Sequence, residues 1–119
     1  ATSALSALPA AGGRQLGESE LKNLLREQPT AAHLHFALGL LYAGETRWPE
    51  AQAAFFEAVR YDAADADYAY NLAVSLDHLA QGTQAAAWYQ RALDLHKPSS
   101  LFDTTAAGNR LASLNSTAP

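Results

Sequence analysis

Apolar residues recur at three- and four-residue spacing along most of the chain, which is the pattern typical of amphipathic α-helices. The first clear stripe covers residues 31–43, with Thr30 before it as a candidate N-cap and Gly44 after it as a stop signal. Pro49 stands where a second helix would have its first turn, a position that tolerates the missing N–H. Because alanine is abundant and β-branched residues are sparse, we expect helices throughout.

The helical pattern repeats with a period of 34 residues. When residues 32–65 are placed over residues 66–99, identical or similar side chains fall at matched positions. Each unit is predicted to form two helices, and in the second unit these cover residues 66–80, after Asp65 as N-cap, and 84–96, after a break at 82–83. The matched pairs include Phe36 with Tyr70, Leu38 with Leu72, Phe55 with Tyr89, Ala58 with Ala92, and Val59 with Leu93.

This period divides the chain into two full repeats and two incomplete ends. The full repeats are residues 30–65 and 66–99. Residues 1–29 are expected to be a truncated preceding repeat, with its second helix at about 18–28 and the end of its first helix at 4–8. Residues 100–114 are expected to form a closing helix that starts at Ser100, and residues 115–119 a frayed tail.

Composition narrows the classes of function. Eight Lys and Arg residues stand against 12 Asp and Glu residues, a formal net charge of −4, which argues against nucleic acid as a partner. The absence of Cys excludes disulfides and thiolate metal sites. No apolar run approaches the ~20 residues needed to cross a bilayer, so we expect no membrane insertion by this segment. The absence of Met predicts that the segment belongs to a longer chain.

The repeat resembles the tetratricopeptide repeat, a helix-turn-helix unit of 34 residues. The resemblance covers residues 14–99 and implies an all-α fold in which the repeats form a right-handed superhelix that binds proteins. Departures from the family pattern are His35 and Ala69, where a bulky residue is usual, and Ala63, where Pro is usual. The positions that match are Leu38, Gly39, Tyr42, Ala51, Phe55 and Ala58 in the first unit, and Leu72, Ala73, Leu76, Ala85, Tyr89 and Ala92 in the second.

A narrower similarity points to a cellular setting. Residues 71–93 are similar to the C-terminal repeats of bacterial membrane-anchored tetratricopeptide proteins of type IV pilus systems, including the mannose-sensitive haemagglutinin type, and of related secretion systems. This similarity implies a scaffold in pilus or secretion-system assembly, as the periplasmic or cytoplasmic part of a membrane-anchored bacterial protein. The residues themselves leave the localisation undetermined.

The resemblance also implies a concave groove lined by the first helix of each unit. The functional interpretation is a hydrophobic groove for a partner segment, because apolar patches with a polar rim tend to mark interaction sites. The alternative is that Phe36 and Tyr70 pack between neighbouring helices, or are covered by the closing helix. The groove residues expected from the register are His33, Phe36, Leu40, Asp67, Tyr70, Val74, Asp77 and His78.

The sequence indicates neither metal binding, nor catalysis, nor a clamp for carboxylates. His33 and His35 are two residues apart and point to different sides of a helix, so we expect no metal site and no cofactor. Ser75, Asp77 and His78 are the residue types of a catalytic triad, but the sequence has no strained turn for the nucleophile, and adjacent residues of a helix cannot orient one another. We therefore expect no enzyme activity. No Lys or Arg occupies the groove positions, which disfavours a clamp for carboxylates, and Asn71 is expected to bond neighbouring backbone.

The sequence therefore predicts a protein-protein interaction module that binds an apolar or amphipathic segment, with Asp67 and Asp77 selecting against acidic partners. The alternative is a structural spacer, or a repeat segment that forms a homo-oligomer through the ends of its repeats. In either case Trp48 and Trp88 are expected to pack between units or on the convex side.

Overall fold

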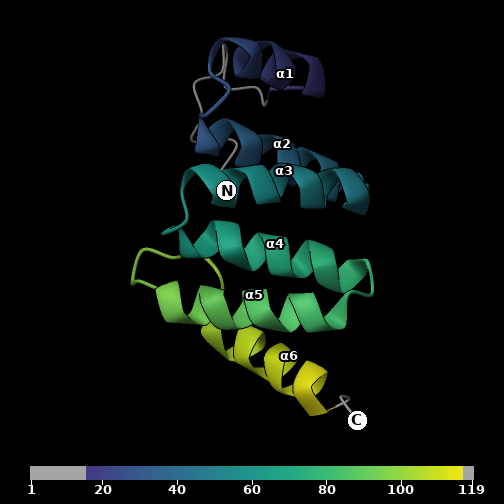
Figure 1. Ribbon diagram of the computed structural model, residues 1–119, viewed down its shortest axis with the longest axis vertical. Helices are drawn as coiled ribbons and strands as arrows, with labels where there is room; N and C mark the ends of the chain where they lie inside the picture. Colours follow the sequence, from purple (N-terminus) through teal and green to yellow (C-terminus); the bar gives the residue numbers. More distant parts are fainter. Residues whose placement is uncertain (1–15, 117–119) are drawn as a thin grey trace.

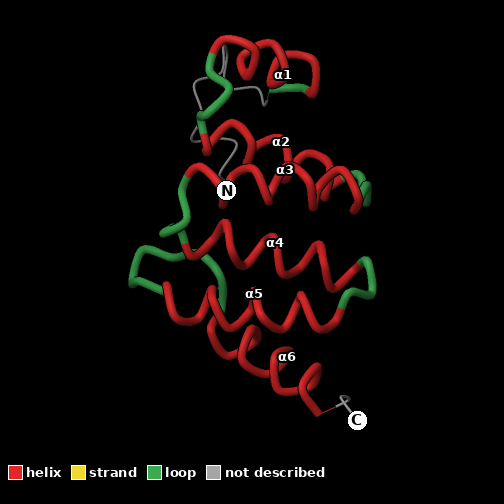
Figure 2. The backbone as a smooth tube through the Cα atoms, in the orientation of Figure 1, coloured by secondary structure: helices red, strands yellow, loops and turns green. Residues whose placement is uncertain are grey.

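The computed structural model describes residues 16–116, and every regular element in that range is an α-helix. The helices lie side by side in chain order along the long axis of the molecule (Figures 1 and 2). The prediction of an all-α fold is confirmed. The expected helix at residues 4–8 and the last three residues of the expected tail lie outside the described range. The helices are α1 (Glu18–Glu27), α2 (Ala32–Gly44), α3 (Trp48–Tyr61), α4 (Ala66–His78), α5 (Gly82–Leu95) and α6 (Thr104–Ser116).

The 34-residue period of the sequence is also a period of the backbone. Helices α2 and α4 begin at Ala32 and Ala66, and α3 and α5 begin at Trp48 and Gly82, so both pairs are separated by 34 positions. The ten residues of α1 correspond to the last ten of α3 at the same offset. Helix α6 starts later than this period requires, at Thr104.

The turn inside each repeat has the same geometry. Thr46 and Ala80, also 34 positions apart, both adopt the left-handed conformation, with φ of 56° and 61°. The next residue in each case donates its N–H to a carbonyl five residues back, from Arg47 to Tyr42 and from Gln81 to Leu76, both at 2.9 Å. These are Schellman motifs, which satisfy the carbonyl groups that a helix leaves unpaired at its end.

This geometry corrects two predicted boundaries. Gly44 was expected to be the first residue after the helix, but it is the last residue of α2. The residue in the left-handed conformation is Thr46. Residues 82–83 were expected to form a break, but Gly82 is the first residue of α5. The hydrogen bond from Arg47 or Gln81 to the carbonyl group five residues back determines where the chain reverses. The position of the nearest glycine does not.

Helix starts are also partly different from the expectation. Asp65 is confirmed as the cap of α4, because its carboxylate accepts the N–H of Tyr68 at 3.1 Å. Thr30 is not a cap, since α2 begins after Ala31 without a side-chain hydrogen bond. Helix α6 starts after Asp103, whose carboxylate accepts the N–H of Thr105 at 2.8 Å, and not at Ser100.

Small residues allow the helices of each repeat to approach closely. Gly39 of α2 lies directly against the ring of Phe55 in α3, which is only 1% exposed. The alanines that the repeat pattern places between helices are fully buried, as close packing requires. These alanines are Ala51, Ala58, Ala85 and Ala92.

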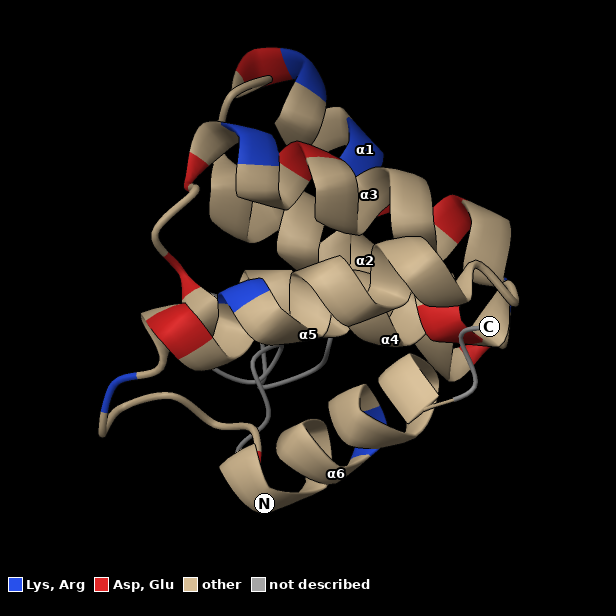
Figure 3. Ribbon diagram, turned by 60° about the horizontal axis from the view of Figure 1, so that its bottom comes forward, with Lys and Arg blue, Asp and Glu red and all other residues tan. Residues whose placement is uncertain are grey.

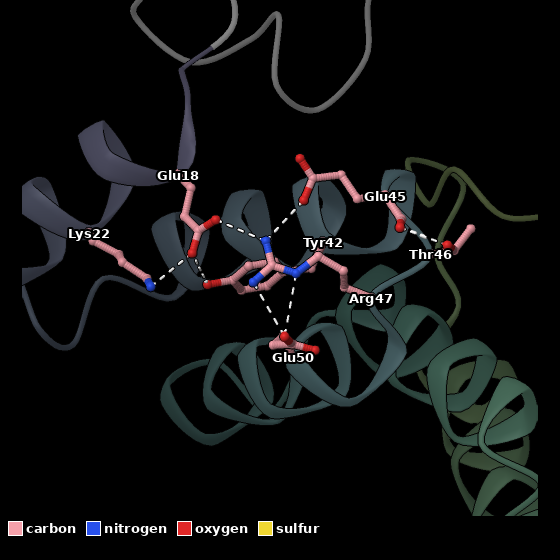
Figure 4. A network of polar contacts seen from close by, with 7 residues as sticks. All are labelled: Glu18, Lys22, Tyr42, Glu45, Thr46, Arg47 and Glu50. Carbon is pink, nitrogen blue, oxygen red and sulfur yellow. Dashed lines mark hydrogen bonds and ion pairs between the residues drawn. The ribbon is translucent and has the colours of Figure 1, made fainter.

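A polar network attaches α1 to the first repeat (Figure 4). The carboxylate of Glu18 accepts a hydrogen bond from the Tyr42 hydroxyl at 2.8 Å and pairs with Lys22 at 2.8 Å and with Arg47 at 3.0 Å. Arg47 also pairs with Glu45 and lies 4.5 Å from the centroid of the Tyr42 ring. Hydrogen bonds from Lys22, then Tyr42 and Arg47, lower the pKa of Glu18 to about 2. The network joins α1 to the turn that follows α2.

Candidate interaction surface

The expected groove residues lie on α2 and α4, but they are not equally open to solvent. Phe36 is only 8% exposed, so the expectation that it occupies an exposed position is wrong for its side chain. His33 and His78 are exposed. The half-buried members of the set are Leu40, Asp67, Tyr70, Val74 and Asp77.

Phe36 belongs to a ring cluster that joins two repeats. Its ring lies 5.6 Å from that of Phe55 in α3 and 4.6 Å from that of Tyr68 in α4, measured between centroids. The rings of both pairs are tilted against each other, and such aromatic contacts stabilise a fold beyond the area that they bury. Phe36 therefore packs between neighbouring helices, which is the alternative that the sequence left open.

The same cluster recurs one period later around Tyr70. Its ring lies 5.9 Å from that of Tyr89 in α5 and 4.6 Å from that of Phe102, which precedes α6. Each of these residues stands 34 positions after its counterpart in the first cluster. Phe102 thus has the same relation to Tyr70 as Tyr68 has to Phe36, and it covers one face of Tyr70.

Asp67 holds the loop that contains Phe102. One carboxylate oxygen, Oδ1, accepts the N–H of Leu101 at 2.8 Å and that of Phe102 at 3.2 Å. The side-chain amide of Asn71 donates to the carbonyl oxygen of Asp67 at 2.8 Å, so the expectation that Asn71 bonds neighbouring backbone is confirmed. The predicted rim carboxylate Asp67 is thus a hydrogen-bond acceptor for the C-terminal segment.

Asp77 attaches α6 itself, which lies across from α4 and α5 in Figure 3. Its two carboxylate oxygens accept from Nε and Nη2 of Arg110 at 2.6 and 2.7 Å, and Oδ2 also accepts from the Tyr89 hydroxyl at 3.0 Å. Arg110 lowers the pKa of Asp77, and Tyr89 adds to that effect while burial opposes it. Burial and the nearby carboxylate raise the pKa of Tyr89 above its ordinary value.

His78 makes a contact between the two repeats. Its ring stacks on that of Trp48 at the start of α3, with 3.8 Å between centroids and 3° between planes. The expectation that Trp48 packs between units is confirmed by this contact. Asp77, His78 and Arg110 also line a polar hollow of about 380 Å³.

The apolar part of the surface is a cavity of about 260 Å³ between α2, α4 and the loop before α6. One of its walls comes from Leu101, which is 80% exposed. Leu101 and Phe102 were not among the expected groove residues, although Phe102 stands one period after Tyr68. The lining residues are Phe36, Leu40, Asp67, Tyr70, Asn71, Leu101 and Phe102.

Among residues 16–116, no three His, Cys, Asp or Glu side chains gather in a way that could hold a metal ion. His35 stacks on Tyr61, and its Nε2 lies 2.9 Å from the carbonyl oxygen of Pro29. Within these residues, no helix combines the length and the apolar character that crossing a membrane requires.

Comparison with known proteins adds no family to this description. No protein-family model matches the chain, and no curated protein has a significantly similar sequence.

Proposed function

We propose that this chain is a protein-protein interaction module, and that a partner segment inserts an apolar side chain into the cavity between α2, α4 and the loop before α6. The observation that carries the proposal is the cavity itself, which is lined mainly by the apolar residues Phe36, Leu40 and Tyr70 together with Leu101 and Phe102. An apolar hollow with a few polar groups at its edge is the usual form of a binding site. Leu101 lies open to solvent beside it.

The free energy for binding would come from removing these apolar walls from water, at about 25 cal/mol for each Å² of apolar area. The rings around the cavity are already held by contacts within the fold, so little conformational entropy is lost when a partner binds. A preformed apolar surface of this kind favours the binding of one specific side chain over nonspecific adhesion.

The tetratricopeptide assignment and the setting in pilus or secretion-system assembly are part of the same proposal. They rest on the sequence resemblance, and the 34-residue recurrence of helices, turns and ring clusters supports the repeat interpretation. In that setting the module would be a scaffold that holds an apolar or amphipathic segment of another protein.

Selection from a peptide library displayed on phage tests the proposal. We expect selected peptides to bind the purified chain in fluorescence anisotropy, and to lose binding to the double variant Leu40→Ser with Leu101→Ser. Phe56→Ser is the matched control, because Phe56 is 47% exposed on α3 and does not line the cavity. Peptides that bind all three proteins equally would show that the cavity is not the site.

Sedimentation velocity over a range of protein concentrations tests the alternative. A binding module whose last helix presents small and polar side chains should stay monomeric, and α6 has such an exposed face. Concentration-dependent dimers, together with failure to select any cavity-dependent peptide, would favour the spacer or self-associating segment instead.

A further inference from the structure

Among the described residues that line the cavity, Asp67 is the one with a charged side chain, and it has no cationic partner within residues 16–116. Asp67 accepts two backbone N–H groups, from Leu101 and Phe102, at a single carboxylate oxygen. Among the ion pairs of residues 16–116, none includes Asp67. Backbone N–H groups orient the carboxylate and hold the loop, but they leave its full negative charge in place.

Two other carboxylates with tertiary contacts differ from Asp67 in this respect. Asp77 is paired with Arg110, and Glu18 is paired with Lys22 and Arg47. Both have hydroxyl donors as well, so their charges are neutralised and their hydrogen bonds are made within the fold. Asp67 is the carboxylate that lines the apolar cavity, and within residues 16–116 it has no counter-charge.

Neighbouring groups increase the negative potential at this end of α4. Burial raises the pKa of Tyr68 to about 12, and the charges of Asp65, Asp62 and Asp67 add to that effect. Asp62 and Asp65 lie in the turn before α4. Lys97 is the one Lys or Arg among residues 96–103, the loop that supplies Leu101, and within the described part of the chain its side chain forms no ion pair. The whole chain has a formal net charge of −4.

The volume of the cavity limits the size of the group that can enter it. At about 260 Å³ it lies below the range of roughly 300–1,000 Å³ that is usual for whole small-molecule ligands. It suits a single side chain of a larger partner. The exposed Leu101 forms an apolar surface on which the chain of such a partner can lie.

We infer that the partner is a protein segment with an apolar anchor residue flanked by Lys or Arg, with the anchor in the cavity and the cation at Asp67. This inference rests on the proposed function and specifies the chemistry of its partner. A flanking Lys or Arg can lay its methylene stem along the apolar wall while its charged end reaches the carboxylate. Opposite charges also increase the rate at which partners meet, and like charges reject acidic segments.

An array of nonapeptides tests the inference. Each peptide has one apolar residue at its centre, flanked by Lys, by Gln or by Glu, and the best binders of each kind are measured by fluorescence anisotropy with the full chain. We expect the Lys-flanked peptides to bind about fivefold more tightly than their Gln-flanked counterparts, and the Glu-flanked ones most weakly. This preference should shrink when salt is raised to about 0.5 M, because salt screens exposed charges.

The Asp67→Asn variant separates the charge from the structure. The amide keeps an oxygen that can accept the N–H groups of Leu101 and Phe102, but it carries no charge. We expect the Lys preference to disappear in this variant while the affinity of the Gln-flanked peptides stays the same. Asp94→Asn is the matched control, since Asp94 is an exposed carboxylate on α5 and should leave the preference intact.

The outcomes distinguish this inference from the proposed function. If Gln-flanked or Glu-flanked peptides bind as well as Lys-flanked ones, the inference is wrong and the cavity remains a binding site. If the Lys preference survives in Asp67→Asn, it reflects the net charge of the chain and the role of Asp67 is refuted. If no peptide of the array binds, the proposed function fails together with the inference.

Discussion

The backbone of Gly39 in α2 lies so close to the ring of Phe55 in α3 that a Cβ atom at position 39 would come within 2.5 Å of Cδ1 and Cε1 of that ring. Phe55 is 1% exposed, so its ring has no open space to move into. Glycine at this position therefore sets how closely the two helices of the first repeat approach each other. Ala73 and Tyr89 hold the corresponding positions in the second repeat, where both are buried.

Gly39→Ala is expected to lower the free energy of unfolding by about 1 to 3 kcal/mol, the usual effect of overpacking a core. Helix propensity alone would give the opposite sign, because alanine is favoured over glycine in a helix by about 1 kcal/mol. Gly108→Ala is the control, since a Cβ in the middle of α6 meets nothing within 4 Å, and it should stabilise the protein slightly. Urea denaturation of both variants makes the comparison, and a stabilised Gly39→Ala would contradict the contact.

The two ring clusters should respond differently to truncation. Phe36→Ala is expected to destabilise the protein by about 3 to 5 kcal/mol, because its ring is buried between Phe55 and Tyr68. Tyr70→Ala should have a smaller effect, since Tyr70 is half-buried and its stack with Phe102 lies at the end of the repeats. Thermal and urea unfolding would both show this order. Equal losses at the two positions would mean that the segment before α6 is as strongly held as the core.

The pair between Asp77 and Arg110 is expected to hold α6 locally. Arg110→Ala should lower the free energy of unfolding only slightly, because an ion pair whose Arg side chain is 47% exposed contributes little to stability. Amide hydrogen exchange in α6 should nevertheless become faster, since local opening needs less free energy than global unfolding. Arg91→Ala, at an exposed position on α5, is the control. Unchanged exchange in α6 would show that apolar contacts alone attach it.

Acid should weaken the attachment of α1. The pKa of Glu18 is about 2 in the folded protein, against an ordinary value of 4.5. A depressed carboxyl pKa gives a contribution to stability that is complete above pH 4.5 and is lost as the pH falls from about 4.5 to 2. Denaturant midpoints measured through this range should fall less steeply for Glu18→Gln than for the original protein. Identical slopes would mean that the network in Figure 4 contributes nothing to folding.

The core of the repeats could be predicted because its packing depends on residue types at fixed spacings in the sequence. A small residue followed at a fixed distance by an aromatic one determines how two helices pack, and Gly39 with Phe55 and Ala73 with Tyr89 follow that rule. The period of these residues also predicted the starts and ends of α2 to α5 to within a few positions.

The turns and the C-terminal segment were less predictable, for two physical reasons. Thr46 and Ala80 adopt a conformation that glycine usually favours, because the hydrogen bonds of the turn compensate for the strain. The contact of Asp67 with Leu101 joins residues 34 positions apart through a loop that departs from the repeat pattern. Nothing in the spacing of apolar residues specifies such a bond.

The stacking of helices in chain order also has a consequence for the way the chain folds. Each helix packs mainly against the helices next to it in sequence, so the relative contact order is low and folding is expected to be fast. In such an array, local opening is easiest at the first and last described helices, because these helices contact fewer neighbours than the central ones do. A transient opening at the C-terminal end would withdraw Leu101 and Phe102 from the cavity while α2 to α5 stay packed.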